Sequence, residues 1–177
     1  MKRVYLLLMV LAGIAKKPVA QNLDSLWQVY NNKSQADTNR LKTIHIIAFS
    51  YINNKPDTTI IIASQELELA IKTKQKLYQG KAHNIMGISY MNKGEYPKAL
   101  EHYLVALKLF EEIKNNKWIS SCYNNIGIVY SNQFNYKKSL EYYFKALKIC
   151  EPSSEKNLLG FCYTNIGVTY FKLFDLN

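Results

Sequence analysis

The stretch Asn124-Asn125-Ile126-Gly127-Ile128-Val129-Tyr130 decides the fold, because its Gly and Tyr return in the same register forty residues to either side. They return in Asn84-Ile85-Met86-Gly87-Ile88-Ser89-Tyr90 and in Thr164-Asn165-Ile166-Gly167-Val168-Thr169-Tyr170. The segments 81–120 and 121–160 are identical at 14 of 40 aligned positions. Self-similarity at a fixed period of this length is typical of a repeat protein.

Each forty-residue unit has the apolar spacing of two helices, with apolar side chains at steps of three and four. In the unit that starts near Lys81, the two predicted helices are separated by Asn92-Lys93-Gly94-Glu95. Gly94 suits the left-handed conformation that ends a helix. Pro97 suits the first turn of the next helix, where an N–H has no intrahelical partner. We therefore predict an all-α chain of antiparallel helical hairpins.

The glycines inside the first helices indicate where the two helices of a hairpin approach each other. Glycine within a helix costs about 1 kcal/mol relative to alanine, so its return at 87, 127 and 167 requires a compensating contact. Ala99 and Ser139 lie twelve residues after the first two glycines, and we expect them to face those glycines. Ala106 and Ala146 are expected to admit the next hairpin.

This pattern resembles the tetratricopeptide repeat, which implies an α-solenoid of stacked hairpins. The period of forty exceeds the usual value of about 34, and Glu111 and Glu151 replace the closing proline, with Pro152 one place late. The chain therefore resembles the long-repeat branch of the family. The positions that the resemblance assigns to packing between helices are Gly87, Tyr90, Ala99, Tyr103, Ala106, Gly127, Tyr130, Ser139, Tyr143, Ala146, Gly167 and Tyr170.

The repeat divides the chain into predicted hairpins at 80–119 and 120–159, with a divergent hairpin at 41–79. In the divergent hairpin, Ala48 replaces the glycine, and we predict its second helix from about Thr58 to Lys76. Residues 21–40 are predicted to be a linker with a short cap helix from Asp24 to Tyr30, and Asp37-Thr38 to be an N-cap. Residues 160–177 are predicted to be the first helix of a further hairpin, so we expect the chain to be part of a longer gene product.

Residues 1–20 have the layout of a signal peptide. Lys2 and Arg3 precede the apolar run Val4–Ala15, which is shorter than the roughly 20 residues that a membrane-spanning helix needs. Cleavage after Ala20 and cleavage after Ala15 both remain open. We expect export to the periplasmic or extracytoplasmic side of a bacterial membrane.

The formal charge of +10 raises the alternative of nucleic-acid binding. Four of the positive charges lie in residues 1–20, which leaves +6 on a processed chain. The basic residues are almost all lysine, whereas base reading favours arginine. The 14 tyrosines could form a stacking platform, but most share one repeat register and are better explained by core packing. We predict no nucleic-acid partner.

The sequence contains no nucleophile elbow, phosphate loop, dinucleotide fingerprint or zinc motif. His45, His83 and His102 fall in separate predicted helices with no carboxylate evidently placed beside them, so we interpret them as ordinary surface or interface residues. Cys122 and Cys162 share a register with Ala82, and Cys150 aligns with Phe110, which favours packing over redox chemistry. We predict no catalytic residue, metal, cofactor or small-molecule substrate in this segment.

The resemblance places a concave groove along the first helices, with asparagines bonding a ligand backbone and apolar residues contacting its side chains. The alternative is a solvated inner wall on a segment that only spaces other domains. Lys81 alone is a poor match to the basic clamp of chaperone-binding members. The candidate groove residues are Lys81, Asn84, Ile88, Met91, Ser121, Asn124, Ile128, Ser131, Phe161, Thr164, Val168 and Phe171.

These expectations together describe a protein-protein interaction scaffold, with a protein or peptide partner and with no enzyme activity in this segment. The layout resembles the exported N-terminal region of bacterial (Bacteroidetes-like) tetratricopeptide sensor proteins. In those, a membrane helix and a histidine kinase or DNA-binding output domain follow the array, so membrane association would come only through a downstream segment. The alternatives are therefore the sensor region of such a signal transduction protein, or a free-standing periplasmic adaptor.

Overall fold

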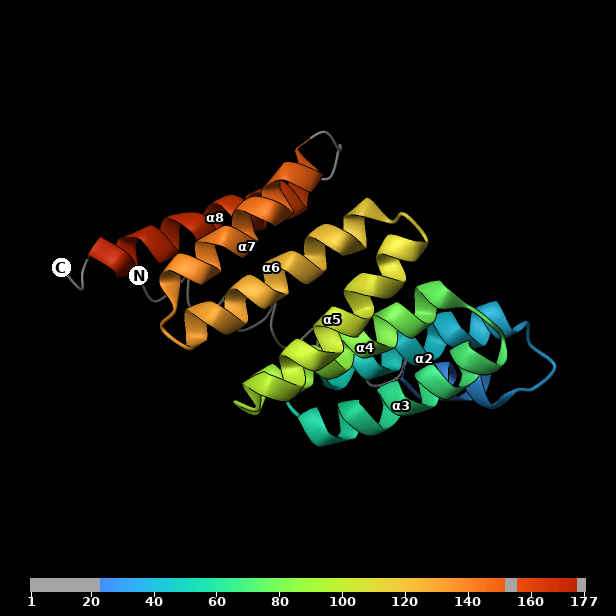
Figure 1. Cartoon of the computed structure of the whole chain (residues 1–177). Helices are drawn as coiled ribbons and strands as arrows, with labels where there is room; N and C mark the ends of the chain where they lie inside the picture. The colour runs from blue at the N-terminus through green and yellow to red at the C-terminus, as the bar shows by residue number, and fades with distance from the viewer. Residues whose placement is uncertain (1–22, 152–155, 175–177) are drawn as a thin grey trace, which may run out of the picture.

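The computed structural model describes residues 23–151 and 156–174, and every regular element in them is an α-helix (Figure 1). The prediction of an all-α fold is confirmed. The predicted signal peptide, Pro152 and residues 175–177 lie outside the described residues. After a short first helix at residues 23–31, the helices are α2 (Asp37–Tyr51), α3 (Pro56–Lys72), α4 (Lys76–Asn92), α5 (Tyr96–Glu112), α6 (Asn116–Asn132), α7 (Tyr136–Cys150) and α8 (Lys156–Phe174).

The hairpins keep the predicted period of forty but begin four residues earlier than expected, at Lys76, Asn116 and Lys156. The helix predicted from about Thr58 to Lys76 is present as α3, but its predicted end is wrong, because α3 ends at Lys72 and α4 begins at Lys76. The sequence of α3 did not indicate where the helix ends, because the turn that follows is made by Lys74 and not by glycine. Asp37 does not cap α2; it is the first helical residue and pairs with Arg40 at 2.8 Å.

Four turns in this chain share one backbone geometry at a spacing of twenty residues. A left-handed residue ends each preceding helix, with φ between 52° and 76°, and these residues are Lys74, Gly94, Lys114 and Phe134. The N–H of the next residue donates to a carbonyl five positions back in every case, as from Glu95 to Tyr90 at 2.9 Å. Of the four, only Gly94 has the residue type that identifies such a turn from sequence.

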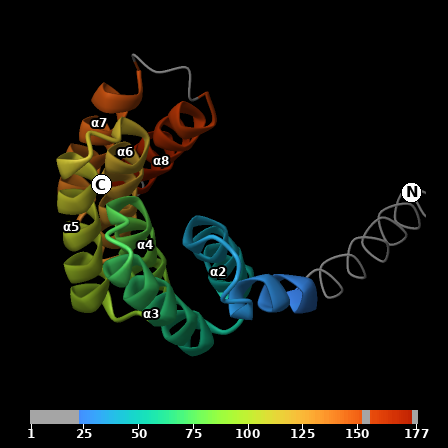
Figure 2. The same ribbon diagram turned by 90° about the vertical axis from the view of Figure 1, so that its right-hand side faces the viewer.

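The helices stack in chain order and curve. Each helix packs on the ones before and after it, and α2, α4, α6 and α8 also contact one another in succession. The described helices α3, α5 and α7 make no such contact among themselves. Because one side of the stack is closer together than the other, the array bends, with α4, α6 and α8 on the inner side and α3, α5 and α7 on the outer side (Figure 2).

The atoms that approach Gly87 and Gly127 most closely belong to aromatic rings of the second helices. A Cβ atom added to Gly87 would lie 2.6 Å from the Tyr103 ring, and one added to Gly127 would lie 2.5 Å from the Tyr143 ring. Ala99 and Ser139 were predicted to face these glycines, but the nearest side chains are those of Tyr103 and Tyr143, each sixteen residues after its glycine. Gly80, which was not singled out from the sequence, also lies against an aromatic ring, because a Cβ atom added to it would lie 2.6 Å from the ring of Phe110.

The remaining packing positions are buried or half-buried in the two central hairpins, whereas those on α8 are not covered in the same way. Ala99, Ala106, Ser139 and Ala146 are fully buried between helices, together with Tyr103 and Tyr143, while Tyr90 and Tyr130 are half-buried. On α8 the register continues without the contact, because no described atom lies within 4 Å of a Cβ built on Gly167, and Tyr170 is 40% exposed.

The cysteines occupy packing positions, as predicted. All three are buried thiols. Cys150, at the end of α7, lies with its Sγ 4.0 Å from that of Cys162 in α8. Burial raises the pKa of Cys162 to about 12 and raises that of Cys122 as well, so these thiols are poor nucleophiles in the folded chain.

Gly127→Ala and Gly167→Ala form a matched pair, because the two glycines share one register and only the first faces a ring. We expect Gly127→Ala to destabilise the chain by about 1–3 kcal/mol, as overpacking does. Gly167→Ala should be neutral or stabilise by up to about 1 kcal/mol through helix propensity. Thermal and urea denaturation followed by circular dichroism measure both. Equal stability of the two variants would contradict the ring contact.

Candidate functional site

A pocket of about 250 Å³ lies on the inner wall where α2, α4 and α6 meet. We call it the inner pocket. Its floor and sides combine aromatic and aliphatic surface with a few polar groups. The lining residues are His45, Phe49, Asn84, Ile85, Ile88, Trp118, Ser121 and Asn125. Because the three helices belong to three successive hairpins, the pocket exists only in the stacked array.

A buried carboxylate lies beside the inner pocket. Glu66 on α3 is fully buried, and His45 Nδ1 lies 3.0 Å from its Oε1 and 3.3 Å from its Oε2. Burial raises the pKa of Glu66, while the His45 hydrogen bond and the charges of His45 and Lys81 oppose that rise. An N–H at Nδ1 donates to the carboxylate, which fixes the orientation of the imidazole and leaves Nε2 as its other polar atom.

Glu66 is an unusual residue for its position in the repeat. Ala106 and Ala146 occupy the corresponding position in the next two hairpins, and both are fully buried. A carboxylate in place of a small apolar residue is costly unless it is paired. The pairing with His45 therefore marks a local departure from the repeat pattern. The prediction that no carboxylate stands beside the histidines is corrected here.

Lys81 places a positive charge against Trp118, which lines the inner pocket. The ammonium of Lys81 lies 5.4 Å from the Trp118 ring centroid and 4.8 Å from that of Tyr78. Burial lowers the pKa of Lys81, and the nearby charges of Lys117 and Lys42 lower it further, against the attraction of Glu66. Trp118 is itself held in place by stacking on Phe110 at 5.3 Å.

Two of the predicted groove asparagines are engaged between neighbouring hairpins. Asn125 Nδ2 donates to Asn84 Oδ1 at 3.0 Å, and Asn165 Nδ2 donates to Asn124 Oδ1 at 2.9 Å. Asn84 is 4% exposed and Asn124 is 8% exposed. Their side-chain oxygens thus join α4 to α6 and α6 to α8 along the inner wall.

The other predicted residues are distributed along the same wall. Ile88 and Ser121 line the inner pocket, and Ser121 also lines a second pocket of about 200 Å³ together with Trp118 and Phe161. Phe161 and Thr164 line a third cavity on α8. Away from these pockets, Met91 and Ile128 pack beside the core, Ser131 is buried, and Val168 and Phe171 are exposed on α8.

Sequence reasoning missed the residues that give the inner pocket its character: His45, Phe49, Trp118 and Asn125. Trp118 and Asn125 lie off the positions that the family resemblance assigns to the groove. His45 and Phe49 lie on those positions, because they stand three residues before and one residue after Ala48, as Asn84 and Ile88 stand around Gly87. The register of the divergent hairpin was therefore one signal, and Glu66 was another, as an acidic residue at a register position that is otherwise alanine. Trp118 carried no such signal, since Leu158 and Tyr78 are also large at its position.

The two remaining histidines meet within one hairpin. His83 Nδ1 on α4 and His102 Nδ1 on α5 are 3.0 Å apart, and Tyr90 stacks on His102 at 5.2 Å. Burial lowers the pKa of His83 to about 4, with a further contribution from His102, against the attraction of Glu101. Burial also lowers the pKa of His102. The corresponding pair in the next hairpin is Tyr123 and Tyr142.

The histidine pair predicts acid sensitivity. Since the unfolded chain binds more protons than the folded chain between about pH 6.5 and pH 4, stability falls as the pH falls through that window. With allowance for its partial exposure, we expect a loss of about 1–2 kcal/mol from the pair. The variant His83→Tyr/His102→Tyr, which copies the next hairpin, should lose less stability between pH 7 and pH 5. Parallel stability curves for the two proteins would refute this assignment.

Two further properties concern the described residues only. Across 23–151 and 156–174, none of the helices has both the length and the apolar character needed to cross a bilayer. Within the same ranges, no three His, Cys, Asp or Glu side chains converge so as to hold a metal ion.

A tetratricopeptide repeat family model matches residues 78–151, which cover α4 to α7 almost completely. No curated protein matches the sequence. Among solved structures, BtubC (BKLC) from P. vanneervenii is similar at 17% identity and a TM-score of 0.71, over 93% of this chain and 68% of that one.

Aspartyl phosphate phosphatase F from Bacillus subtilis is similar at 18% identity and a TM-score of 0.74, over 80% of this chain and 38% of that one. A signal transduction ATPase with a tetratricopeptide repeat sensor, from Pyrococcus horikoshii, is similar at 17% identity and a TM-score of 0.69, over 84% of this chain and 23% of that one. This chain therefore spans well under half of these two proteins. At such identities, the likeness establishes the fold alone, that of a tetratricopeptide solenoid.

Proposed function

We propose that this array, whose two central hairpins are tetratricopeptide repeats, is a binding scaffold that holds an extended peptide segment of a partner protein along its inner wall. Tetratricopeptide arrays in general bind proteins, and the inner wall of this one carries consecutive pockets. The observation that carries the proposal is that Trp118 and Ser121 line two adjacent pockets. A ligand crossing from one pocket to the next would pass over both residues.

The composition of the wall suits a peptide. Phe49 is 59% exposed at one end and Phe161 is 63% exposed at the other, so apolar anchors stand on both sides of Trp118. Large aromatic residues in pockets contribute most of the binding energy in typical interfaces. Asn84 Oδ1 and His45 Nδ1 are engaged in hydrogen bonds within the chain, which supports a role of these two residues in shaping the pocket. We propose holding, without catalysis, as the task of this segment.

Selection of displayed random peptides against the whole chain tests the groove, with Trp118 fluorescence as the readout in a Trp27→Phe background. We expect Phe49→Glu to weaken the selected peptides by about thirtyfold, the loss typical of a buried anchor. Leu104→Glu is the matched control, because Leu104 is 52% exposed on the outer helix α5. Peptides that bind Phe49→Glu as well as they bind the wild type would sink the proposal in favour of a solvated inner wall.

We further propose that the chain is exported and acts as the N-terminal part of a longer signalling protein. The sequence of residues 1–20 supports export. The exposed apolar side chains of α8, among them Phe171 at 68% and Phe174 at 74%, support a further helix packing there. A sensor region preceding a kinase or DNA-binding output domain and a free periplasmic adaptor remain the two alternatives. Translating the codons that follow distinguishes them.

Export has a direct test in a bacterial host. We expect the chain expressed from Met1 to appear in the periplasmic fraction, with the intact mass of a chain that begins at Gln21 or at Lys16. A substitution of the apolar run, Leu7→Arg/Leu8→Arg, should retain the uncleaved chain in the cytoplasm. Recovery of the wild-type chain in the cytoplasm with Met1 still attached would refute export.

A further inference from the structure

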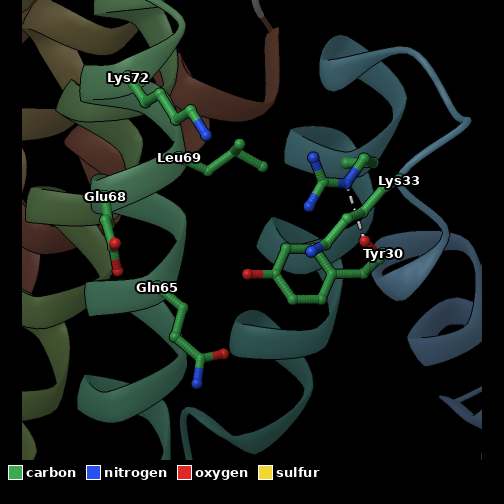
Figure 3. Close-up of a pocket in the computed structure, with 7 residues that line it drawn as sticks. Tyr30, Lys33, Gln65, Glu68, Leu69 and Lys72 are labelled. Atoms are coloured by element: carbon green, nitrogen blue, oxygen red, sulfur yellow. Dashed lines mark hydrogen bonds between the residues drawn. The ribbon is translucent and has the colours of Figure 1, made fainter.

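Another, chemically different pocket lies at the N-terminal end of the array, and it shares no lining residue with the inner pocket. It has a volume of about 410 Å³ and opens between the first helix, the turn that follows it and the start of α2 on one side and α3 on the other (Figure 3). We call it the cationic pocket. Its lining residues are Tyr30, Lys33, Arg40, Gln65, Glu68, Leu69 and Lys72.

Arg40 is fixed at the wall of this pocket. Its Nε donates to the Tyr30 carbonyl oxygen at 2.9 Å, its Nη1 donates to Asp37 Oδ1 at 2.8 Å, and its guanidinium lies 5.5 Å from the Tyr30 ring centroid. The side chain is only 16% exposed. These contacts involve Nε and Nη1, so the N–H groups of Nη2 are left to a ligand. An arginine held in this way presents donors without a further loss of side-chain freedom.

Two lysines reach into the same space from opposite walls. Lys33 extends from the side of the first helix, and Lys72 and Leu69 extend from α3 toward it, while the carboxylate of Glu68 stays close to α3 (Figure 3). Among the described residues, neither Lys33 nor Lys72 forms an ion pair. The lining residues comprise three cationic side chains and the carboxylate of Glu68. Asp37, which pairs with Arg40 from outside the lining, brings the local excess to one positive charge.

Neutral donors complete the lining. Tyr30 is half-buried, and burial, more than the charge of Glu68, raises the pKa of its phenol, so the hydroxyl keeps its proton at neutral pH. Gln65 adds a carboxamide. The pocket therefore offers guanidinium, ammonium, hydroxyl and amide donors around one cavity. Its size falls in the range of about 300–1,000 Å³ that is usual for small-molecule sites.

We propose that the cationic pocket binds a phosphate monoester. A phosphoryl group carries a charge of about −1.5 to −2 at pH 7 and three strong acceptor oxygens, which matches the three cationic donor side chains Arg40, Lys33 and Lys72. A carboxylate has only two acceptor oxygens and would leave donors unused. The volume leaves room for the organic group that bears the phosphate. The shared chemistry is the phosphoryl dianion, whether it belongs to a phosphorylated side chain or to a free small molecule.

Calorimetric titration of the whole chain at constant ionic strength tests this site with phosphoserine, glycerol phosphate and inorganic phosphate as probes, and with acetate as the comparison anion. We expect the phosphates to bind and acetate not to bind. Lys33→Gln and Lys72→Gln should each weaken binding about tenfold, as the loss of a charge-assisted hydrogen bond does. Glu68→Gln should strengthen it.

Lys137→Gln on α7 is the matched control, because it removes the same charge from an exposed position outside the pocket. It should leave the affinity unchanged. A preference for phosphoserine over glycerol phosphate would assign the site to a phosphorylated partner, and the reverse preference to a free metabolite. Absence of binding at millimolar phosphate, equal binding of acetate, or an equal loss in Lys137→Gln would each overturn the proposal. So would binding seen only with anionic lipid vesicles.

Discussion

The contact on which this architecture depends is that of an aromatic ring against a helix backbone that has no side chain. Tyr103 lies on Gly87 and Tyr143 lies on Gly127 at distances that leave no room for a Cβ atom. The glycine costs about 1 kcal/mol in helix propensity, and the ring fills the space with a large, rigid apolar surface. Since the contact sits within the hairpin, it fixes how closely the two helices approach before any neighbour is added.

The turns then convert this local approach into a repeating geometry. Left-handed residues at 74, 94, 114 and 134 end helices at equal intervals, so each hairpin is presented to the next in the same orientation. Pairs of asparagines, such as Asn84 with Asn125, tie successive first helices together on the inner side. The inner pocket and the pocket beside Phe161 follow from this stacking, because each takes its walls from more than one hairpin.

The repeat, the helix type and the packing role of the glycines and tyrosines could be predicted because each is written in sequence at a fixed spacing. Helix ends were less predictable: Lys74, Lys114 and Phe134 adopt a conformation that favours glycine, since the tertiary structure holds them there. The inner pocket was predicted only in part. Ile88 and Ser121 follow the repeat, whereas the His45–Glu66 pair joins residues on two helices that no local pattern relates. Side chains that depart from the repeat are the ones that give its surface an individual chemistry.

The unequal spacing of the two layers also sets the mechanical character of the array. The first helices touch along the inner side, whereas α3, α5 and α7 have no contacts with one another. Opening or tightening the arc therefore breaks no contact between the described outer helices, while sliding one hairpin past another would separate asparagine from asparagine on the inner side. The ring–glycine contacts lie within a hairpin and would be kept in either motion. A change in the curvature of the array therefore costs fewer contacts between hairpins than a shift of one hairpin along the next.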